Sequence, residues 1–333
     1  MIFSKSKLPI LKKYYLYSLD HIYFLNILLL PFSTIYLLIN LIKKYFFSNK
    51  KNNTIPVIVI GNLTVGGTGK TSLVIWLCNY FSSRKYNIAV ISGGYKTIDP
   101  NKIQIVNEDS KPNEVGDEAI LISKKTQSIV CKCKNRKLAY EFLVKNYNLD
   151  FIISDDGLTH YKLNRNLNIV IVRENKPFGN GLVFPAGPLR ELPSSINSYD
   201  NVIFNKSKKS NVPGFYYDIS KLKSILNNAE LDIESLSGTS VHLVTAIANP
   251  DLLIKSLNRY NVDIISHIYP DHYLLNEEDF IFNDNLKTIM TEKDFVKCGD
   301  FNLENAYYLP TKIIVDNDIK IMLNNQISNL LKV

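Results

Sequence analysis

The chain has 333 residues, 46% of them hydrophobic and 21% charged, which is enough for one large domain or two modest ones. This composition excludes a disordered chain, and 14 glycines and 13 prolines are too few for a collagen-like or low-complexity protein. The formal net charge is +8, of which residues 1–51 carry +7 through eight lysines and one acidic residue. Because a nucleic-acid-binding protein spreads its basic charge over the folded body, we expect no nucleic-acid partner.

The N-terminal segment, residues 1–51, is predicted to associate with a membrane. Residues Ile22–Ile42 carry no formal charge, and as a helix they would extend about 32 Å, close to the hydrocarbon thickness of a bilayer. Aromatic residues and lysines flank this run on both sides, as is typical of a membrane interface. Polar residues and Pro31 interrupt the run, so a helix that spans the bilayer and one that lies in a single leaflet are both open. A buried helix of a soluble domain is the alternative.

The four cysteines are expected to be free and buried. Cys78, Cys131, Cys133 and Cys298 are too few for a disulfide framework in a chain of this length. The spacing of Cys131 and Cys133 is too short for a zinc-binding hairpin, and no second pair of ligands follows.

After residue 52, aliphatic runs alternate with helix-compatible stretches. The predicted strands of the first part are Val57–Ile60, Ile88–Ile91, Phe151–Ser154, Ile169–Val172 and Val202–Phe204, and its predicted helices are Thr71–Arg84 and Arg136–Asn146. A second alternation contains the predicted strands Val241–Thr245, Ile264–Ile268 and Lys287–Met290 and the predicted helices Asp251–Tyr260 and Asp316–Leu331. Continuous aliphatic strands are typical of a parallel sheet covered on both faces. We therefore predict an α/β protein with two α/β/α sandwich lobes, at residues 52–206 and 241–333, joined by a linker at 207–240.

A glycine-rich loop follows the first predicted strand and precedes a helix. It reads Gly61-Asn-Leu-Thr-Val-Gly-Gly-Thr-Gly-Lys-Thr71, which differs from the usual phosphate-loop pattern in having threonine instead of glycine at the first position. Its glycines allow backbone N–H groups to point at a phosphate, while Lys70 would contact the β- and γ-phosphates of ATP and Thr71 would bind Mg²⁺. The predicted nucleotide-binding residues are Thr64, Val65, Gly66, Gly67, Thr68, Gly69, Lys70 and Thr71. The first lobe is therefore predicted to be a parallel sheet of the P-loop NTPase type.

Two adjacent carboxylates follow the predicted strand at residues 151–154. Asp155 and Asp156 would lie at the carboxyl edge of the sheet, where ligands bind in open α/β proteins. Adjacent carboxylates repel each other unless a cation is near, so we expect both to bind the metal together with Thr71. A solvated turn at the end of the strand is the alternative.

Seven motifs, in order along the chain, resemble those of the tetraacyldisaccharide 4'-kinase family over about residues 56–298. Besides the glycine-rich loop they are Val115-Gly-Asp-Glu118, Asp155-Asp-Gly-x-x-His160-Tyr161, Phe178-Gly-Asn-Gly181, Pro185-Ala-Gly-Pro-Leu-Arg-Glu191, Pro270-Asp-His272 and Met290-Thr-Glu-Lys-Asp294. The resemblance implies a lipid kinase that transfers the γ-phosphate of ATP to the 4'-hydroxyl of a tetraacylated glucosamine disaccharide 1-phosphate, giving lipid IVA. It implies ATP and Mg²⁺ as cofactors, a membrane surface as partner, and a location on the cytoplasmic face of the inner membrane of a Gram-negative bacterium. No obligate protein partner is evident in the sequence.

The resemblance also implies roles for individual residues. Asp117 and His272 are the candidate base and its partner, because an aspartate that accepts a hydrogen bond from one imidazole nitrogen fixes the tautomer and raises the basicity of the ring. Arg190 could bridge phosphate oxygens and, with Lys70, would complete the catalytic set. From the residues alone, a helix cap for Asp117, a surface position for His272 and a structural ion pair for Arg190 remain alternatives.

Some positions depart from the family pattern. Gly93 stands where the family has arginine, Thr159 where it usually has glutamine and Asn166 where aspartate is usual. These departures leave the glycine-rich loop and the acidic pair intact. His160 and Glu191 are the candidate substrate contacts, with packing as the alternative for His160.

Two other functions remain open at this point. A membrane-tethered regulatory or targeting ATPase would use the glycine-rich loop and the anchor but would leave Asp117 and His272 without a task. A catalytically inactive scaffold is the third possibility. ATP consumption that depends on an acylated disaccharide acceptor would distinguish the kinase from both.

Overall fold

The structure is a computed structural model that describes residues 21–47, 53–94, 97–107, 109–247, 250–271, 273–298 and 301–332. Two units are distinguished, each with its own sheet. We call the unit made of the described residues up to Tyr216 and from Ile314 onward the phosphate-loop unit, and Tyr217–Ile313 the second unit.

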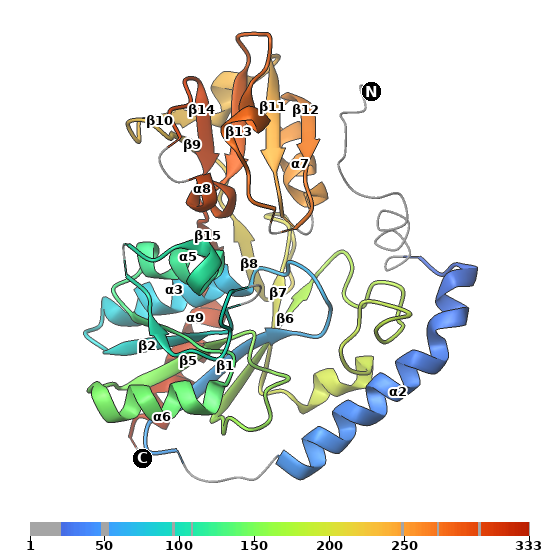
Figure 1. The fold of residues 1–333 in the computed structure, drawn as a ribbon, viewed down its shortest axis with the longest axis vertical. Coiled ribbons are helices and arrows are strands. Elements are labelled where there is room, and N and C mark those ends of the chain that lie inside the picture. The colour runs from blue at the N-terminus through green and yellow to red at the C-terminus, as the bar shows by residue number, and fades with distance from the viewer. Residues whose placement is uncertain are drawn as a thin grey trace. The chain divides into compact units, whose positions relative to one another are not determined.

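A nine-stranded sheet forms the centre of the phosphate-loop unit, in the order β15-β8-β7-β6-β1-β5-β2-β4-β3 (Figure 1). Its strands are β1 (Val57–Asn62), β2 (Ile88–Ser92), β3 (Gln104–Ile105), β4 (Ile129–Lys132), β5 (Phe151–Asp155), β6 (Leu167–Arg173), β7 (Asn201–Asn205), β8 (Gly214–Tyr217) and β15 (Ile313–Val315). The pairs from β8 across to β4 are parallel, and β3 pairs antiparallel with β4. Strands β1, β2 and β5 are buried along their whole length, which is why they read as continuous apolar runs.

Helices lie on both faces of this sheet. The helical segments of the unit are α2 (Phe24–Phe47), which lies apart from the sheet, α3 (Lys70–Ser82), α4 (Pro112–Val115), α5 (Asp117–Lys125), α6 (Arg136–Asn146), η1 (Pro193–Ser198) and α9 (Asn317–Leu330). Figure 1 shows α3 and α5 on one side of β1, β2 and β5, and α6 on the other. Helix α6 begins after Asn135, whose side-chain oxygen accepts a hydrogen bond from the backbone N–H of Leu138.

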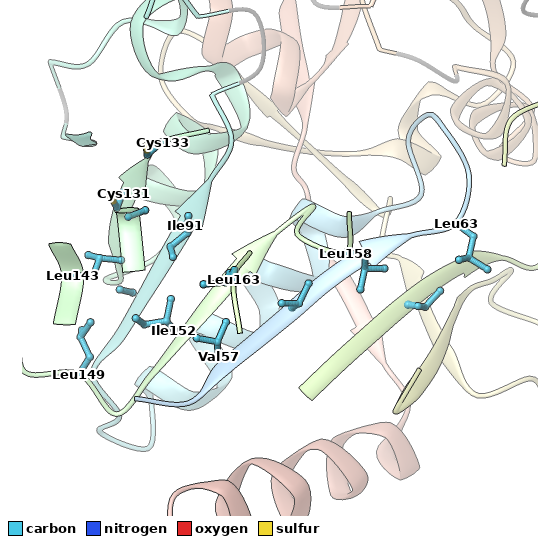
Figure 2. Packing of buried hydrophobic residues seen from close by; sticks show 14 of the residues in the cluster. Val57, Leu63, Ile91, Cys131, Cys133, Leu143, Leu149, Ile152, Leu158 and Leu163 are labelled. Carbon is cyan, nitrogen blue, oxygen red and sulfur yellow. The ribbon is translucent and has the colours of Figure 1, made fainter. Parts of the chain in front are cut away.

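A core cluster of this unit lies where the sheet meets α6 (Figure 2). Alternate residues of β1, Val57 and Val59, belong to this cluster together with Ile152 of β5 and Leu143 of α6. The residues between them in β1 point to the opposite face of the sheet. The central strand is therefore held by apolar burial on both sides, and this fixes the position of the loop that follows it.

Helix α2 is long and apolar enough to cross a membrane, and only 11% of its most apolar window is buried. Its buried residues are Asn26 and Ser33, both polar. The large exposed side chains on its other faces are Phe24, Leu25, Ile27, Leu28, Leu30, Phe32, Ile35, Leu38, Ile39, Leu41, Ile42, Tyr45, Phe46 and Phe47. The helix thus turns polar groups toward the protein and apolar groups outward, the reverse of a helix that packs on a soluble core.

The second unit contains a six-stranded sheet in the order β10-β9-β14-β13-β11-β12. Its elements are β9 (Lys221–Ser224), β10 (Glu230–Asp232), η2 (Ile233–Leu236), β11 (Ser240–Thr245), α7 (Asp251–Asn258), β12 (Asp263–Ile268), η3 (Glu277–Phe280), β13 (Lys287–Thr291), α8 (Glu292–Cys298) and β14 (Ala306–Leu309). The four strands from β12 to β14 are parallel. On β11 and β12, His242 Nδ1 lies 2.9 Å from His267 Nε2, and His242 Nε2 lies 3.1 Å from both carboxylate oxygens of Asp284.

The observed units differ from the sequence-based division at two places. The segment expected as a linker, residues 207–240, contains β8 of the first sheet and β9 and β10 of the second. Helix α9 belongs to the phosphate-loop unit, where the side chain of Asn201 donates a hydrogen bond of 2.6 Å to Gln326, although residues 241–333 were expected to form one lobe.

Candidate active site

The glycine-rich loop connects β1 to α3 and is held by the side chain of Asn62. This amide donates hydrogen bonds to the carbonyls of Thr64, at 2.6 Å, and Gly66, at 3.2 Å, and its oxygen accepts one of 3.2 Å from Lys70 Nζ. Gly66 and Gly69 have φ values of 108° and 94°, which glycine adopts without strain. Asn62 was not singled out from the sequence because its partners become apparent only in the folded loop.

The acidic pair lies beside this loop because β1 and β5 are neighbours in parallel register, with Ile60 opposite Asp155. Thr71 Oγ1 donates a hydrogen bond of 3.3 Å to Asp155 Oδ2, whereas Asp155 Oδ1 is buried without a hydrogen-bond partner. Asp156 faces the cations instead. Its two carboxylate oxygens accept hydrogen bonds of 2.7 and 3.2 Å from the guanidinium of Arg190, and Lys70 Nζ lies 3.8 Å away. The structure therefore brings Lys70, Thr71, Arg190 and both aspartates together.

The two aspartates differ in charge because their surroundings differ. Burial, with a further contribution from Glu118, raises the pKa of Asp155 to about 7. Burial alone would also raise the pKa of Asp156, but Lys70 and Arg190 outweigh it and hold this pKa below its usual range. At neutral pH Asp156 is thus fully ionised, while Asp155 can still take up a proton.

Arg136 is a further residue of the site that the sequence reasoning missed. It is only 3% exposed, and its Nη2 donates a hydrogen bond of 2.5 Å to the backbone carbonyl of Asp155. Its Nε and Nη1 are buried without a hydrogen-bond partner. An ideal Cβ built on Gly93 would lie 2.9 Å from Arg136 Nη2, so the guanidinium fills the space beside this glycine. A buried cation with unpaired N–H groups is a feature that anionic ligands satisfy.

The two candidate substrate contacts have different surroundings. Glu191 is buried, and its two carboxylate oxygens accept hydrogen bonds of 2.9 and 3.0 Å from the hydroxyls of Tyr161 and Tyr199. His160 lines a hollow of about 340 Å³, and burial together with the charge of Arg136 lowers its pKa to about 4, so it is neutral at physiological pH.

This hollow, which we call the basic hollow, is rich in positive charge. It is lined by Lys43, Phe47, Asn101, Lys134, Asn135, Arg136, Lys137, Thr159, His160, Tyr161, Lys162 and Leu163. None of these described residues is acidic, so the hollow is suited to an anion. A second hollow, of about 430 Å³, lies near the start of β2 and β4, at the edge of the sheet opposite the glycine-rich loop.

Of the candidate base and its partner, the structure describes only Asp117. Asp117 is buried at the first position of α5, and its Oδ1 accepts a hydrogen bond of 3.0 Å from the backbone N–H of Glu118. His272, its expected partner, lies outside the described residues.

Comparison with known proteins gives a consistent result. The family model described as Tetraacyldisaccharide-1-P 4'-kinase matches residues 25–328. The chain belongs to this family. The tetraacyldisaccharide 4'-kinase of Coxiella burnetii (strain CbuK_Q154) is 36% identical over 308 residues, which cover 91% of this chain and 92% of the relative. That of Hahella chejuensis is 38% identical over 293 residues, covering 85% and 87%. The crystal structure of LpxK from Aquifex aeolicus in complex with ATP aligns with a TM-score of 0.73 and 26% identity, over 91% of this chain and 99% of that one.

Membership of the tetraacyldisaccharide 4'-kinase family confirms the resemblance and the predicted mixed α/β fold with an N-terminal apolar helix. A member of this family is a kinase of lipid A biosynthesis that transfers phosphate from ATP to a hydroxyl group. The site is consistent with this activity, since a glycine-rich loop, two cations and an acidic pair converge at the carboxyl edge of one parallel sheet.

Proposed function

We propose that this protein transfers the γ-phosphate of ATP to the 4'-hydroxyl of tetraacyldisaccharide 1-phosphate and so produces lipid IVA. The observation that carries the proposal is the convergence of Lys70 and Arg190 on one carboxylate beside the glycine-rich loop, in a chain of this kinase family. Two cations that share a partly exposed anion can exchange it for phosphate oxygens. Phosphoryl transfer depends mainly on this kind of charge stabilisation and on positioning.

The donor set beside the loop fits a magnesium ion. The Thr71 hydroxyl and the Asp155 carboxylate lie together, and one buried oxygen of Asp155 has no hydrogen-bond partner. Mg²⁺ prefers oxygen ligands and takes few of them from the protein, with phosphates and water completing its shell. We propose that Thr71 and Asp155 hold Mg²⁺, which when bound neutralises charge on the phosphates. Since both oxygens of Asp156 bond to Arg190, we assign Asp156 the orientation of this cation rather than direct coordination.

Asp117 and His272 remain the proposed base and its partner. Replacing either with alanine should lower kcat by roughly a hundred- to ten-thousandfold, and the double variant should be little worse, because a base and the group that orients it act as one unit. The affinity for ATP should stay the same in all three variants. If the two single effects multiply in the double variant, the residues act independently and the pairing is wrong.

The basic hollow is the proposed site for the 1-phosphate of the acceptor. Its lysines and Arg136 can neutralise a phosphate monoester, and its lining includes His160, four residues after Asp156. Replacing Lys134 and Lys162 with alanine should raise the KM of the acceptor about tenfold. The same change should have little effect on an acceptor that lacks the 1-phosphate. Equal losses for both acceptors would contradict this assignment.

We further propose that α2 attaches the enzyme to the cytoplasmic face of the inner membrane by lying in one leaflet. Asn26 and Ser33 contact the phosphate-loop unit, and near the other end of the helix Lys162 Nζ lies 4.7 Å from the ring centroid of Phe47. These contacts along the helix support a position against the protein in one leaflet over a crossing of the bilayer. Its exposed apolar faces are suited to lipid.

The decisive experiment follows the lipid product. Full-length enzyme is incubated with ATP and the tetraacylated acceptor in mixed micelles, and mass spectrometry should detect one added phosphate, with release of ADP only when acceptor is present. An acceptor that lacks the 4'-hydroxyl is the control and should give neither. Release of ADP without acceptor would instead favour a membrane-tethered regulatory ATPase.

A further inference from the structure

Helix α2 makes a polar contact with the rest of the phosphate-loop unit. Asn26 and Ser33 are seven residues apart, so they lie on the same face of the helix, and both are buried. The side-chain amide of Asn26 donates a hydrogen bond of 2.7 Å to the carbonyl of Ala186. The hydroxyl of Ser33 donates one of 2.7 Å to the carbonyl of Val183 and accepts one of 3.0 Å from the N–H of Ala186.

These contacts all reach one short stretch, residues Val183–Arg190, which we call the bracing segment. Figure 1 shows the yellow-green chain after β6 running beside the blue helix α2. At its other end the bracing segment contacts the glycine-rich loop. The carbonyl of Pro188 accepts a hydrogen bond of 2.7 Å from Val65 N, and Arg190 N donates one of 2.7 Å to the carbonyl of Leu63. A β-bridge joins Leu189 to Thr64 between these two bonds.

The bracing segment is tied to itself as well. Gly187 N donates a hydrogen bond of 3.1 Å to the carbonyl of Val183, and Phe184 N donates one of 2.8 Å to that of Leu189. An ideal Cβ on Gly187 would lie 2.2 Å from the carbonyl oxygen of Leu182, so the turn is tightly closed. Such a turn has little room to deform. A displacement of the residues that contact α2 therefore also moves the residues that contact the glycine-rich loop.

We infer that Ser33 and Asn26 are positioning residues. Through the bracing segment they fix the positions of the glycine-rich loop and of Arg190. The membrane helix is then part of the nucleotide site's support and not only an anchor. Ser33 has the larger effect of the two, because it also accepts a hydrogen bond from the backbone N–H of Ala186. The bond of Asn26 matters less, because the Ala186 carbonyl that it contacts accepts a second hydrogen bond, of 3.0 Å, from the side chain of Asn180. The inference adds to the proposed function, but its test needs ATP alone.

The test compares four variants of the full-length enzyme. Ser33→Ala removes both hydrogen bonds to the bracing segment, and Ser33→Thr restores the hydroxyl. Asn26→Ala removes the hydrogen bond to Ala186 and also the one of 2.6 Å that Asn26 Oδ1 accepts from Tyr23 N at the start of the helix. Thr34→Ala is the matched control, since Thr34 is the next residue and is exposed. Among the described residues, its hydroxyl donates a hydrogen bond to the carbonyl of Leu30 within the helix and makes no contact with the bracing segment. ATP affinity is measured by calorimetry without acceptor, and sedimentation with phosphatidylglycerol-containing vesicles reports membrane binding.

We expect Ser33→Ala to weaken ATP binding about five- to tenfold and Asn26→Ala about twofold, with Ser33→Thr and Thr34→Ala close to wild type. Vesicle binding should be equal in all four, because the exposed apolar side chains are unchanged. Unchanged ATP affinity in both Ser33→Ala and Asn26→Ala, with or without a loss of vesicle binding, would overturn the inference. So would an equal loss in Thr34→Ala. If Ser33→Ala does not fold, Asn26→Ala against Thr34→Ala decides alone. A missing acceptor-dependent activity would leave these results unaffected and would count only against the proposed function.

Discussion

Replacing Asp156 with asparagine tests the electrostatic arrangement of the site. The change keeps the shape of the side chain but removes the only charge that the described structure places between Arg190 and Lys70. Breaking a fully buried ion pair costs about 3–5 kcal/mol and breaking an exposed one less than about 1 kcal/mol. The Asp156 side chain is 31% exposed, so we expect a loss of about 1–2 kcal/mol. For a unit of this size that lowers the Tm by about 2–8 °C.

ATP should offset much of this loss. In the variant its phosphates supply the anion that the two cations lack, so the difference in Tm from wild type should fall by at least half when saturating ATP is present. Thermal melts of the full-length enzyme with and without ATP, in the presence of a chelator, measure both values. Glu141→Gln is the control, because it removes an exposed ion pair with Lys137 and should not change the Tm measurably. An equal loss of Tm with and without ATP would refute the view that Asp156 and the phosphates share the same cations.

Three further predictions follow from named contacts. Lys70→Ala should lower turnover at least about a hundredfold, measured as initial rates, while the Tm changes little because Asp156 keeps its bonds to Arg190. Gly157→Ala should destabilise the phosphate-loop unit by about 1–3 kcal/mol in urea, because the new Cβ would lie 2.5 Å from Ser154 Oγ; a loss below about 0.5 kcal/mol would show that the turn can adapt. Burial and the charge of His242 lower the pKa of His267 in the native second unit. Below about pH 6.5, His267 therefore takes up a proton more readily in the unfolded chain than in the native state, and protonation favours unfolding. The stability of this unit should therefore fall as the pH drops from 7.5 to 5.5, and His267→Gln should reduce this dependence.

The central sheet was predictable because its strands are buried on both faces. The predicted strands at 57–60, 88–91 and 151–154 are each observed, extended by one or two residues, and the predicted helix Arg136–Asn146 is observed with the same bounds. The short strands β9 and β10 were missed because their exposed, charged residues form no apolar run. Their pairing depends on partners elsewhere in the second sheet, which local pattern does not reveal.

Site residues that belong to a local sequence motif were predictable. Site residues whose contacts come from distant parts of the chain were not. Lys70 and Thr71 are recognisable within one loop, and Asp155 from the end of its strand. Arg136 is not, because its contact with the carbonyl of Asp155 joins a helix to a different strand. Glu191 likewise accepts a hydrogen bond from the hydroxyl of Tyr161, although the two residues are 30 positions apart in the sequence. Such long-range polar contacts leave no periodic signal in the sequence.

The burial of all four cysteines makes them reporters of local opening. Each is at most 2% exposed, and burial raises the pKa of Cys78, Cys131 and Cys298 to about 12. A thiol reagent at neutral pH therefore cannot reach these buried thiols in the native protein and reacts only when the surrounding structure opens. Cys298 lies in the second unit and the other three in the phosphate-loop unit. The rate at which each thiol is modified thus reports how often the structure around it opens. No label has to be introduced into the enzyme for this measurement.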